Sequence, residues 1–288
     1  AGQSIKWTPD EILDGRKVLD IDPKYLEDPA KMRIALKDYS PTLIINTAAY
    51  TDVDGAETNR EYAFALNALA PRFIAEWCLA NNAALIHFST DYVYDGVGGS
   101  PYLEETETRP INVYGESKLA GDVAIAESGI PYLILRTSWL YDSRGKNFLL
   151  TMLRLGAKNE SLSVVSDQIG APTSARLVAS TTAKIIQQTN RLGIEKQFVK
   201  ASLVHCTTSG ETSWHGFSEA IFEGARQRGA QLKVREVKPI SSGEYPTVAA
   251  RPENSRLSLT RLKETYAIET PNWRDELDYT LDEIYGLR

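Results

Sequence analysis

The chain has 288 residues, a formal net charge of −6 and 42% hydrophobic residues, which suits one large α/β domain with a smaller lobe attached. That apolar content argues against disorder. The acidic balance argues against a protein that binds a nucleic-acid polymer, because such proteins carry a basic excess on one face. No apolar run approaches the roughly 18 residues that a membrane-spanning helix needs, so we expect a soluble protein with no membrane association.

The cysteines and histidines give no sign of a metal site. Cys78 and Cys206 lie far apart and outside any metal-ligand spacing, which predicts a reduced, cytoplasmic protein. The three histidines are also scattered along the chain. His87 and His205 each lie within an apolar run, where a buried, hydrogen-bonded core histidine is the expected interpretation.

The first two-thirds of the chain alternates two kinds of segment. Apolar, β-branched runs predict buried parallel strands, and apolar residues at helical spacing predict helices. In chain order we expect a strand at 42–46, a helix at 59–80, a strand at 84–88, a helix at 117–127, a strand at 132–136 and a helix at 148–155. This alternation indicates βαβ units. The sequence therefore predicts an α/β fold with a Rossmann-like, doubly wound parallel sheet.

The alternation changes after about residue 160. We then expect a strand at 163–165, a helix at 177–188, a strand at 204–206, a helix at 213–228, a Pro- and Ser-rich stretch at 239–252 and closing helices near Arg261 and Arg274. We assign residues 1–210 to the Rossmann-like domain and 211–288 to a smaller C-terminal α/β lobe for substrate, with pieces interleaved from 140–165. Such a lobe would lie over the carboxyl ends of the strands, where open α/β sheets bind ligands.

Tyr114 and Lys118 form a Tyr-x-x-x-Lys pair at the start of a predicted helix. This spacing places both side chains on one helix face, one turn apart. A carbonyl that receives a hydride needs a proton, but a phenol with a pKa of about 10 is a reluctant donor at neutral pH. A lysine cation nearby stabilises the phenolate and lowers that pKa. By spacing alone, however, a solvated helix with a tyrosine at its edge is the better interpretation.

Small and polar residues follow two of the predicted strands. The segment Ser89 to Gly96 begins directly after the strand at 84–88, where a hydroxyl can donate a hydrogen bond to a substrate carbonyl. A turn that caps the strand is the structural alternative. The segment Asn46 to Tyr50 begins at the last residue of the strand at 42–46. Its small side chains would let an extended ligand lie close to the backbone. The Tyr-Lys pair, one strand connection further along, favours a ligand site.

Several blocks extend this pattern from about residue 40 to the C-terminus. They read AAYTDVDGAE, STDYVYDG, NVYGESKLAG, RTSWLY, KNFLLTMLRL, DQIGAPT and RPENSRL. In this order they resemble the extended short-chain dehydrogenase/reductase family, and within it the dTDP-4-dehydrorhamnose reductases. The resemblance implies an oxidoreductase that uses NADPH or NADH to reduce the 4-keto group of a dTDP-sugar, dTDP-4-dehydro-6-deoxy-L-mannose, to dTDP-L-rhamnose.

The resemblance also implies roles for individual residues. Tyr114 would be the proton donor, Lys118 would tune its pKa and bind the cofactor ribose, and Thr90 would polarise the C4 carbonyl. Besides Tyr114 and Lys118, the residues implied at the cofactor are Ala48, Ala49, Tyr50 and Ser89. Besides Thr90, those implied at the sugar nucleotide are Val53, Asp91, Trp139, Arg251 and Asn254. A cation such as Arg251 suits a diphosphate, although a surface arginine is the structural alternative.

The glycine-rich loop of a Rossmann-like domain is not found in this chain. That loop follows the first strand and places the cofactor pyrophosphate at a helix N-terminus. Gly2 stands alone, the glycines at 96–99 indicate a surface loop, and Ser4 to Trp7 looks more like a second strand than a first. We expect that the chain as given lacks the opening strand, loop and helix, roughly 25 to 30 residues. A variant that has lost its pyrophosphate site is the alternative.

Cofactor choice and assembly stay open at this point. Asp10 and Glu11 lie near the end of that second strand, where acidic residues favour NADH over NADPH. The resemblance allows a homodimer, which some relatives build around a magnesium ion. No ligand cluster in the sequence supports Mg²⁺ or any other metal.

Two other functions are compatible with the same fold. A non-catalytic regulatory or binding subunit would have no need for a proton donor such as Tyr114, whereas the missing glycine loop favours such a subunit. A sugar-nucleotide epimerase or dehydratase would recycle its cofactor within one turnover. Dehydratases add acidic residues beside the catalytic threonine, and Asp91 lies beside Thr90. Net consumption of NADPH or NADH separates a reductase from an epimerase or dehydratase.

Overall fold

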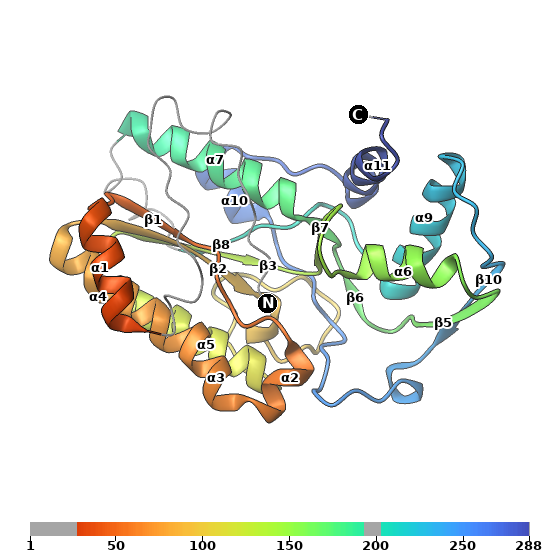
Figure 1. The fold of residues 1–288 in the computed structure, drawn as a ribbon, viewed down its shortest axis with the longest axis horizontal. Coiled ribbons are helices and arrows are strands. Elements are labelled where there is room, and N and C mark those ends of the chain that lie inside the picture. The colour runs from red at the N-terminus through yellow and green to blue at the C-terminus, as the bar shows by residue number, and fades with distance from the viewer. Residues whose placement is uncertain (1–27, 193–202, 288) are drawn as a thin grey trace.

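The computed structural model describes residues 28–192 and 203–287 (Figure 1). Its centre is an all-parallel, four-stranded sheet with the strand order β1-β2-β3-β8. The strands are β1 (Leu43–Asn46), β2 (Ala84–Thr90), β3 (Tyr132–Thr137) and β8 (Leu203–His205). Each lies within a residue of its expected position except at the end of β2, which runs on to Thr90. The predicted α/β fold with a parallel sheet is confirmed.

Helices cover both faces of this sheet (Figure 1). One face carries α1 (Pro29–Tyr39), α4 (Ala70–Asn81) and α5 (Val113–Ala126), and the other carries α7 (Ala175–Leu192) and α10 (Thr260–Tyr266). Successive strand residues point to opposite faces. Leu85 accordingly packs with α4 and α5, whereas Ile86 packs with α7 and α10. His87, two residues after Leu85, faces α5.

The helices and strands outside the four-stranded sheet and its covering helices pack around a second hydrophobic cluster. It joins α6 (Phe148–Gly156), β5 (Ser161–Val165), α9 (Trp214–Gln227), β10 (Glu236–Ile240) and α11 (Trp273–Ile284). β5 and β10 pair in parallel along their whole length. Segments from 148–165 and from 214–284 therefore share one core. The division at residue 210 into a cofactor domain and a substrate lobe stays a prediction.

Some elements differ from the sequence-based expectation. The helix expected at 59–80 is a succession of α3 (Arg60–Phe64), a π-helical segment (Ala65–Leu69) and α4. The helix expected at 117–127 begins earlier, at Val113, because the Asn112 side chain caps it. α1, α2 (Val53–Thr58) and β10 were not expected. The short strands β4 (Leu140–Tyr141), β6 (Ile169–Gly170), β7 (Thr173–Ser174) and β9 (Thr212–Ser213) form two further pairs.

The described residues were also compared with the requirements of a membrane span, a metal site and a disulfide bond. Within residues 28–192 and 203–287, none of the helices combines the length and apolar content that a membrane span requires. Over the same residues, no group of three or more histidine, cysteine, aspartate or glutamate side chains is arranged to hold a metal ion. Cys78 and Cys206 are buried and not bonded to each other.

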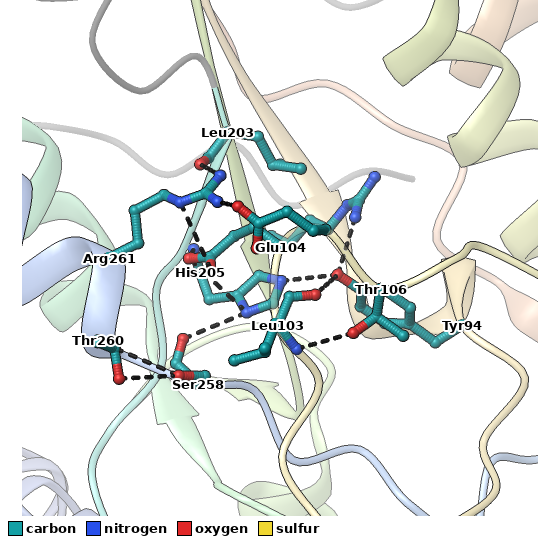
Figure 2. Close-up of polar contacts among 11 residues, drawn as sticks. Tyr94, Leu103, Glu104, Thr106, Leu203, His205, Ser258, Thr260 and Arg261 are labelled. Atoms are coloured by element: carbon teal, nitrogen blue, oxygen red, sulfur yellow. Dashed lines mark hydrogen bonds and ion pairs between the residues drawn. The ribbon is translucent and has the colours of Figure 1, made fainter.

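His205 lies in a buried polar network at the end of β8 (Figure 2). Its Nδ1 donates to the backbone oxygen of Ser258 at 3.2 Å, and its Nε2 lies 2.8 Å from the Tyr94 hydroxyl, which also lies 3.1 Å from the backbone oxygen of Leu103. The Glu104 carboxylate accepts from the His205 backbone N–H at 3.0 Å. Because a carbonyl oxygen can only accept, the contact with Ser258 places a hydrogen on Nδ1, and burial keeps the ring neutral at neutral pH.

This network predicts a pH-dependent loss of stability. Burial, followed by the Arg136 cation, lowers the pKa of His205 from 6.5 to about 3. Between these two pH values the unfolded chain binds a proton that the folded chain excludes, so stability falls as the pH drops. The free energy of unfolding of the wild type, minus that of His205→Gln, should fall by up to about 1.4 kcal/mol per pH unit below pH 6. Urea unfolding at several pH values measures this difference, and a constant difference would contradict the prediction.

Candidate active site

The three predicted catalytic residues come from two neighbouring elements. Thr90 is the last residue of β2, and Tyr114 and Lys118 lie in the first two turns of α5. Lys118 Nζ donates to the backbone oxygen of Phe88 at 2.6 Å, so the lysine reaches back to β2. The structure thus brings the three residues together at the carboxyl end of β2, the edge at which open α/β sheets bind ligands. Their catalytic roles stay predictions.

The Tyr114 hydroxyl is set up to hold a proton. Burial strongly raises the pKa of Tyr114, a hydrogen bond with Thr90 lowers it in part, and the Asp91 carboxylate raises it again. The Thr90 hydroxyl itself donates to Asp91 Oδ1 at 3.1 Å. Tyr114 therefore keeps its proton at neutral pH, but without ligands it is a weaker acid than a free phenol, and the expected lowering of its pKa by Lys118 is not seen. Donation of this proton requires that the phenolate be stabilised in the complex with substrate and cofactor.

Lys118 is only 2% exposed, an unusual position for a lysine. Burial lowers the pKa of its ammonium group to about 8, and the Asp122 carboxylate, one turn further along α5, opposes that shift. Near neutral pH this side chain is thus close to the balance between its charged and uncharged forms. Such a balance is typical of groups that take part in proton transfer.

The start of α5 is held by a cap and a close backbone contact. Asn112 Oδ1 accepts from the backbone N–H of Gly115 at 2.8 Å, while Asn112 Nδ2 donates to the backbone oxygen of Ala250 at 2.8 Å. A Cβ atom on Gly115 would lie 2.1 Å from the backbone oxygen of Tyr92. The position of Tyr114 therefore depends on a glycine beside it.

Replacing Gly115 with alanine should reduce turnover. The added methyl group must push the first turn of α5 away from Tyr92, and Tyr114 moves with that turn. A displacement of about 1 Å at a catalytic group can cost about a hundredfold in rate, so we expect a loss of that order in kcat. Steady-state kinetics measure it, with Gly129→Ala as a control because a Cβ there meets nothing within 4 Å, although its φ of +76° adds local strain. Equal activity of wild type and Gly115→Ala would contradict the expected displacement.

Asn67 links the segment after β1 to α5. It is fully buried in the π-helical segment, a type of helix that often marks functional sites. Its amide accepts from the Tyr50 backbone N–H at 2.8 Å and donates to the Tyr50 backbone oxygen at 3.0 Å and to the Ser117 hydroxyl at 2.9 Å. Asn67 could not be predicted from the sequence, because nothing in the local pattern separates it from other helical asparagines.

The residues predicted at the cofactor lie at the same edge of the sheet. Ala48 and Ala49 follow β1 and are half-buried, and the Ala48 backbone N–H donates to Asn46 Oδ1 at 3.2 Å. Tyr50 is held by Asn67, as described above. The Ser89 hydroxyl donates to Asp122 Oδ2 at 2.8 Å, so its proton is already engaged within the protein.

Trp139 follows the carboxyl end of β3 by two residues and has a constrained backbone conformation. Its φ of +49° is in the left-handed region, which a bulky residue rarely adopts. Its ring stacks on Trp214 of α9, with 3.6 Å between ring centroids. A Cβ atom on Gly170 would lie 2.7 Å from the Trp139 ring. Trp214 was not predicted from the sequence, and its indole N–H donates to Gln168 Oε1 at 3.1 Å.

The other residues predicted at the substrate have different surroundings. Arg251 pairs with Asp54 Oδ2 of α2 at 2.8 Å, and Val53 is the first residue of that helix. Asn254 is buried and donates to the backbone oxygen of Ser100 at 2.9 Å, so it fixes a loop. Burial raises the pKa of Asp91 to about 6. Contact of these residues with a substrate stays a prediction.

Comparison with known proteins gives this site a context. A profile of the RmlD substrate binding domain family matches residues 15–285. The chain belongs to this family. The dTDP-4-dehydrorhamnose reductase of Escherichia coli (strain K12) is 40% identical over 258 residues, which cover 90% of this chain and 85% of that protein. The protein of the same name from Burkholderia thailandensis is 42% identical over 248 residues, 85% of this chain and 83% of that protein.

A solved structure with NADP bound has the same fold as this RmlD-family chain. The dTDP-4-dehydrorhamnose reductase of Bacillus anthracis in complex with NADP is 34% identical, with a TM-score of 0.80, and the match covers 93% of this chain and 90% of that one. The predicted resemblance is confirmed. Gly2, Ser4 to Trp7, Asp10 and Glu11, on which the predictions about the pyrophosphate loop and the cofactor choice depend, lie outside the described residues.

The described part of the RmlD-family site suits the nicotinamide end of a dinucleotide. The side chains of Ala48 and Ala49 are small, so a flat ligand can approach the backbone after β1. Lys118 reaches the same edge from α5, and its charged form has three N–H donors of the kind that bind ribose hydroxyls. Donor chemistry and small side chains thus agree with the cofactor that the resemblance implies.

Proposed function

We propose that this chain reduces the 4-keto group of dTDP-4-dehydro-6-deoxy-L-mannose to give dTDP-L-rhamnose, with NADPH or NADH as the cofactor. The observation that carries this proposal is the meeting of Thr90, Tyr114 and Lys118 at the carboxyl end of β2. The relatives named dTDP-4-dehydrorhamnose reductase supply the substrate class, and the NADP complex supports the cofactor.

Each of the three side chains has a separate task. When bound, the dihydronicotinamide supplies the hydride that C4 receives. On substrate binding the Thr90 hydroxyl turns away from Asp91 Oδ1, to which it donates in the free protein, and donates to the carbonyl oxygen as negative charge develops there. Tyr114 gives its proton to that oxygen, and the Lys118 ammonium group stabilises the phenolate that remains.

In this proposal the sugar and the dTDP group of the substrate lie between the parallel sheet and the second hydrophobic cluster. Asp91 Oδ2 is buried and has no hydrogen-bond partner among the described residues, so it is available to a sugar hydroxyl. Trp139 packs against the sugar nucleotide, with Val53 and Asn254 around it. Arg251 binds the diphosphate, and its ion pair with Asp54 breaks when it does so.

The decisive experiment follows the absorbance of NADPH or NADH in the presence of dTDP-4-dehydro-6-deoxy-L-mannose. A reductase consumes one cofactor for each sugar reduced, and the decay requires the sugar nucleotide. An epimerase or dehydratase would return the cofactor to its starting state, and a binding subunit would leave both reactants unchanged. The names of the relatives favour the reductase over these alternatives. Product formation without net consumption of cofactor would refute the proposal.

The proposal includes a cytoplasmic location and allows a homodimer. Two buried, unpaired cysteines are in keeping with a reducing compartment. Light scattering on the purified chain, with and without Mg²⁺, measures the oligomeric state and its dependence on a metal.

A further inference from the structure

Behind Lys118 lies a buried chain of hydrogen bonds that the proposed chemistry does not use. Lys118 Nζ lies 3.1 Å from Nε2 of His87, and Nδ1 of His87 lies 3.1 Å from Nδ2 of Asn46. The exposed fractions of Asn46, His87 and Lys118 are 6%, 1% and 2%. These groups are thus withdrawn from water, and each must find its hydrogen-bond partners within the protein.

The orientation of the Asn46 side-chain amide decides the polarity of this chain. The Ala48 backbone N–H donates to Asn46 Oδ1 at 3.2 Å, so the amide oxygen faces Ala48 and the amide nitrogen faces His87. An amide nitrogen only donates, so Nδ1 of His87 must accept. Burial holds the pKa of His87 well below its usual range, and a charged Lys118 lowers it further, so the ring is neutral with either form of the lysine. Its single ring hydrogen therefore lies on Nε2, the atom that faces Lys118.

This polarity constrains Lys118. A charged ammonium group has only donors, so its N–H would face the N–H of His87 Nε2. An uncharged amine has a lone pair and can accept that hydrogen bond, while it still donates to the backbone oxygen of Phe88. We propose that Asn46 and His87 are positioning residues that lower the proton affinity of Lys118, so that its ammonium group gives up a proton more readily.

Other charged groups around Lys118 act in both directions. The Asp122 carboxylate favours the charged form, but Asp122 is itself paired with Arg136 of β3 at 3.2 Å. Asp91 and Tyr114, at the other end of the site, both have raised pKa values because they are buried. The hydrogen-bond polarity of Asn46 and His87 and the burial of Lys118 both lower the pKa of Lys118. The Asp122 carboxylate opposes both effects.

The inference rests on the proposed function for its role in the reaction. In the reduction, the O–H bond of Tyr114 breaks as the new hydroxyl at C4 forms. The phenolate then takes a proton from the Lys118 ammonium group, which becomes the amine and regains a proton from solvent once the product has left the site. His87 stabilises that amine through its Nε2–H, so the pair Asn46–His87 assists the recovery of the Tyr114 proton.

The Asn46→Asp variant reverses the polarity with little change of shape. A carboxylate accepts both from the Ala48 N–H and from a hydrogen on His87 Nδ1, so Nε2 becomes the acceptor for a charged Lys118. The position of the ring hydrogen is read by two-bond ¹H–¹⁵N NMR on protein labelled with ¹⁵N-histidine. We expect Nε2–H for His87 in the wild type and Nδ1–H in Asn46→Asp, with the signals of His87 identified by their loss in His87→Gln. His205, held with its hydrogen on Nδ1, is the internal control (Figure 2).

Kinetics provide a second readout. In Asn46→Asp, the step in the pH profile of kcat/KM that belongs to Lys118 should move upward by about one unit, a tenfold change in proton affinity. Asn46→Ala separates polarity from added charge, because it frees His87 to accept without introducing a carboxylate. We expect a smaller upward shift there, and no shift in Asn46→Ala would assign the whole effect to charge and overturn the proposal.

The NMR measurement stands apart from activity. A wild-type His87 with its hydrogen on Nδ1 overturns the inference even if the chain is an active reductase. A chain that reduces no dTDP-sugar but shows Nε2–H on His87 refutes the proposed function and leaves the polarity of Lys118 established. Should Asn46→Asp fail to fold, the wild-type spectrum alone decides between the two tautomers.

Discussion

Replacing Tyr114 with phenylalanine should lower kcat at least about a hundredfold, the usual effect of losing a general acid. The change removes one oxygen atom, whose hydrogen bond is made to Thr90, and keeps the ring that packs edge-on against Tyr92. The fold and the affinity for NADPH or NADH should therefore remain close to those of the wild type. Stopped-flow absorbance of the reduced nicotinamide measures the rate, and cofactor fluorescence measures binding.

Tyr92→Phe is the matched control for that variant. Tyr92 is half-buried like Tyr114 and lies 5.5 Å from it between ring centroids. Its hydroxyl is hydrogen-bonded with Arg251, so its loss should raise KM for the sugar nucleotide more than it lowers kcat. A much smaller loss of turnover is expected. Near-normal turnover in Tyr114→Phe would assign the proton donor to another group, whereas equal losses in both variants would indicate a packing effect.

Replacing Asp122 with alanine should reduce the free energy of unfolding by about 3–5 kcal/mol, the range found when one partner of a buried ion pair is removed. Asp122 Oδ2 accepts from Arg136 Nε and Nη2, each at 3.2 Å, and the exposed fractions of the two side chains are 4% and 5%. Without the carboxylate the guanidinium group stays buried, and among the described residues it keeps the Tyr94 hydroxyl, at 2.9 Å, and the face of the Tyr94 ring. Equilibrium unfolding in urea measures the loss.

Two comparisons test the cause of that loss. The double variant Asp122→Leu with Arg136→Met removes both charges, and it should be more stable than Asp122→Ala because no charge is left unpaired. Glu269→Ala breaks the Lys263–Glu269 pair, whose side chains are 65% and 71% exposed, and should change stability little. A loss in Asp122→Ala no greater than in Glu269→Ala would mean that the buried pair contributes nothing.

The sequence supplied much of the fold and the centre of the site. Strands with continuous apolar runs were placed well, because burial on both faces leaves a local signal. Tyr114 and Lys118 share a helix face because a four-residue spacing fixes their relation within one turn. α1 has a weaker apolar pattern, and β10 lies in a Pro- and Ser-rich stretch and is defined only by its pairing with β5, so both were missed.

What only the tertiary structure decided is the set of contacts around that pair. His87 meets Lys118 across 31 residues of sequence, Asn46 meets His87 across 41, and Asn67 meets Ser117 across 50. From the sequence His87 was interpreted as a core histidine, and it is buried, but its partners could not be named. Spacing along the chain determines which side chains share a turn or a strand face. The strand order, the register and the helix that covers each face determine which of them meet across elements.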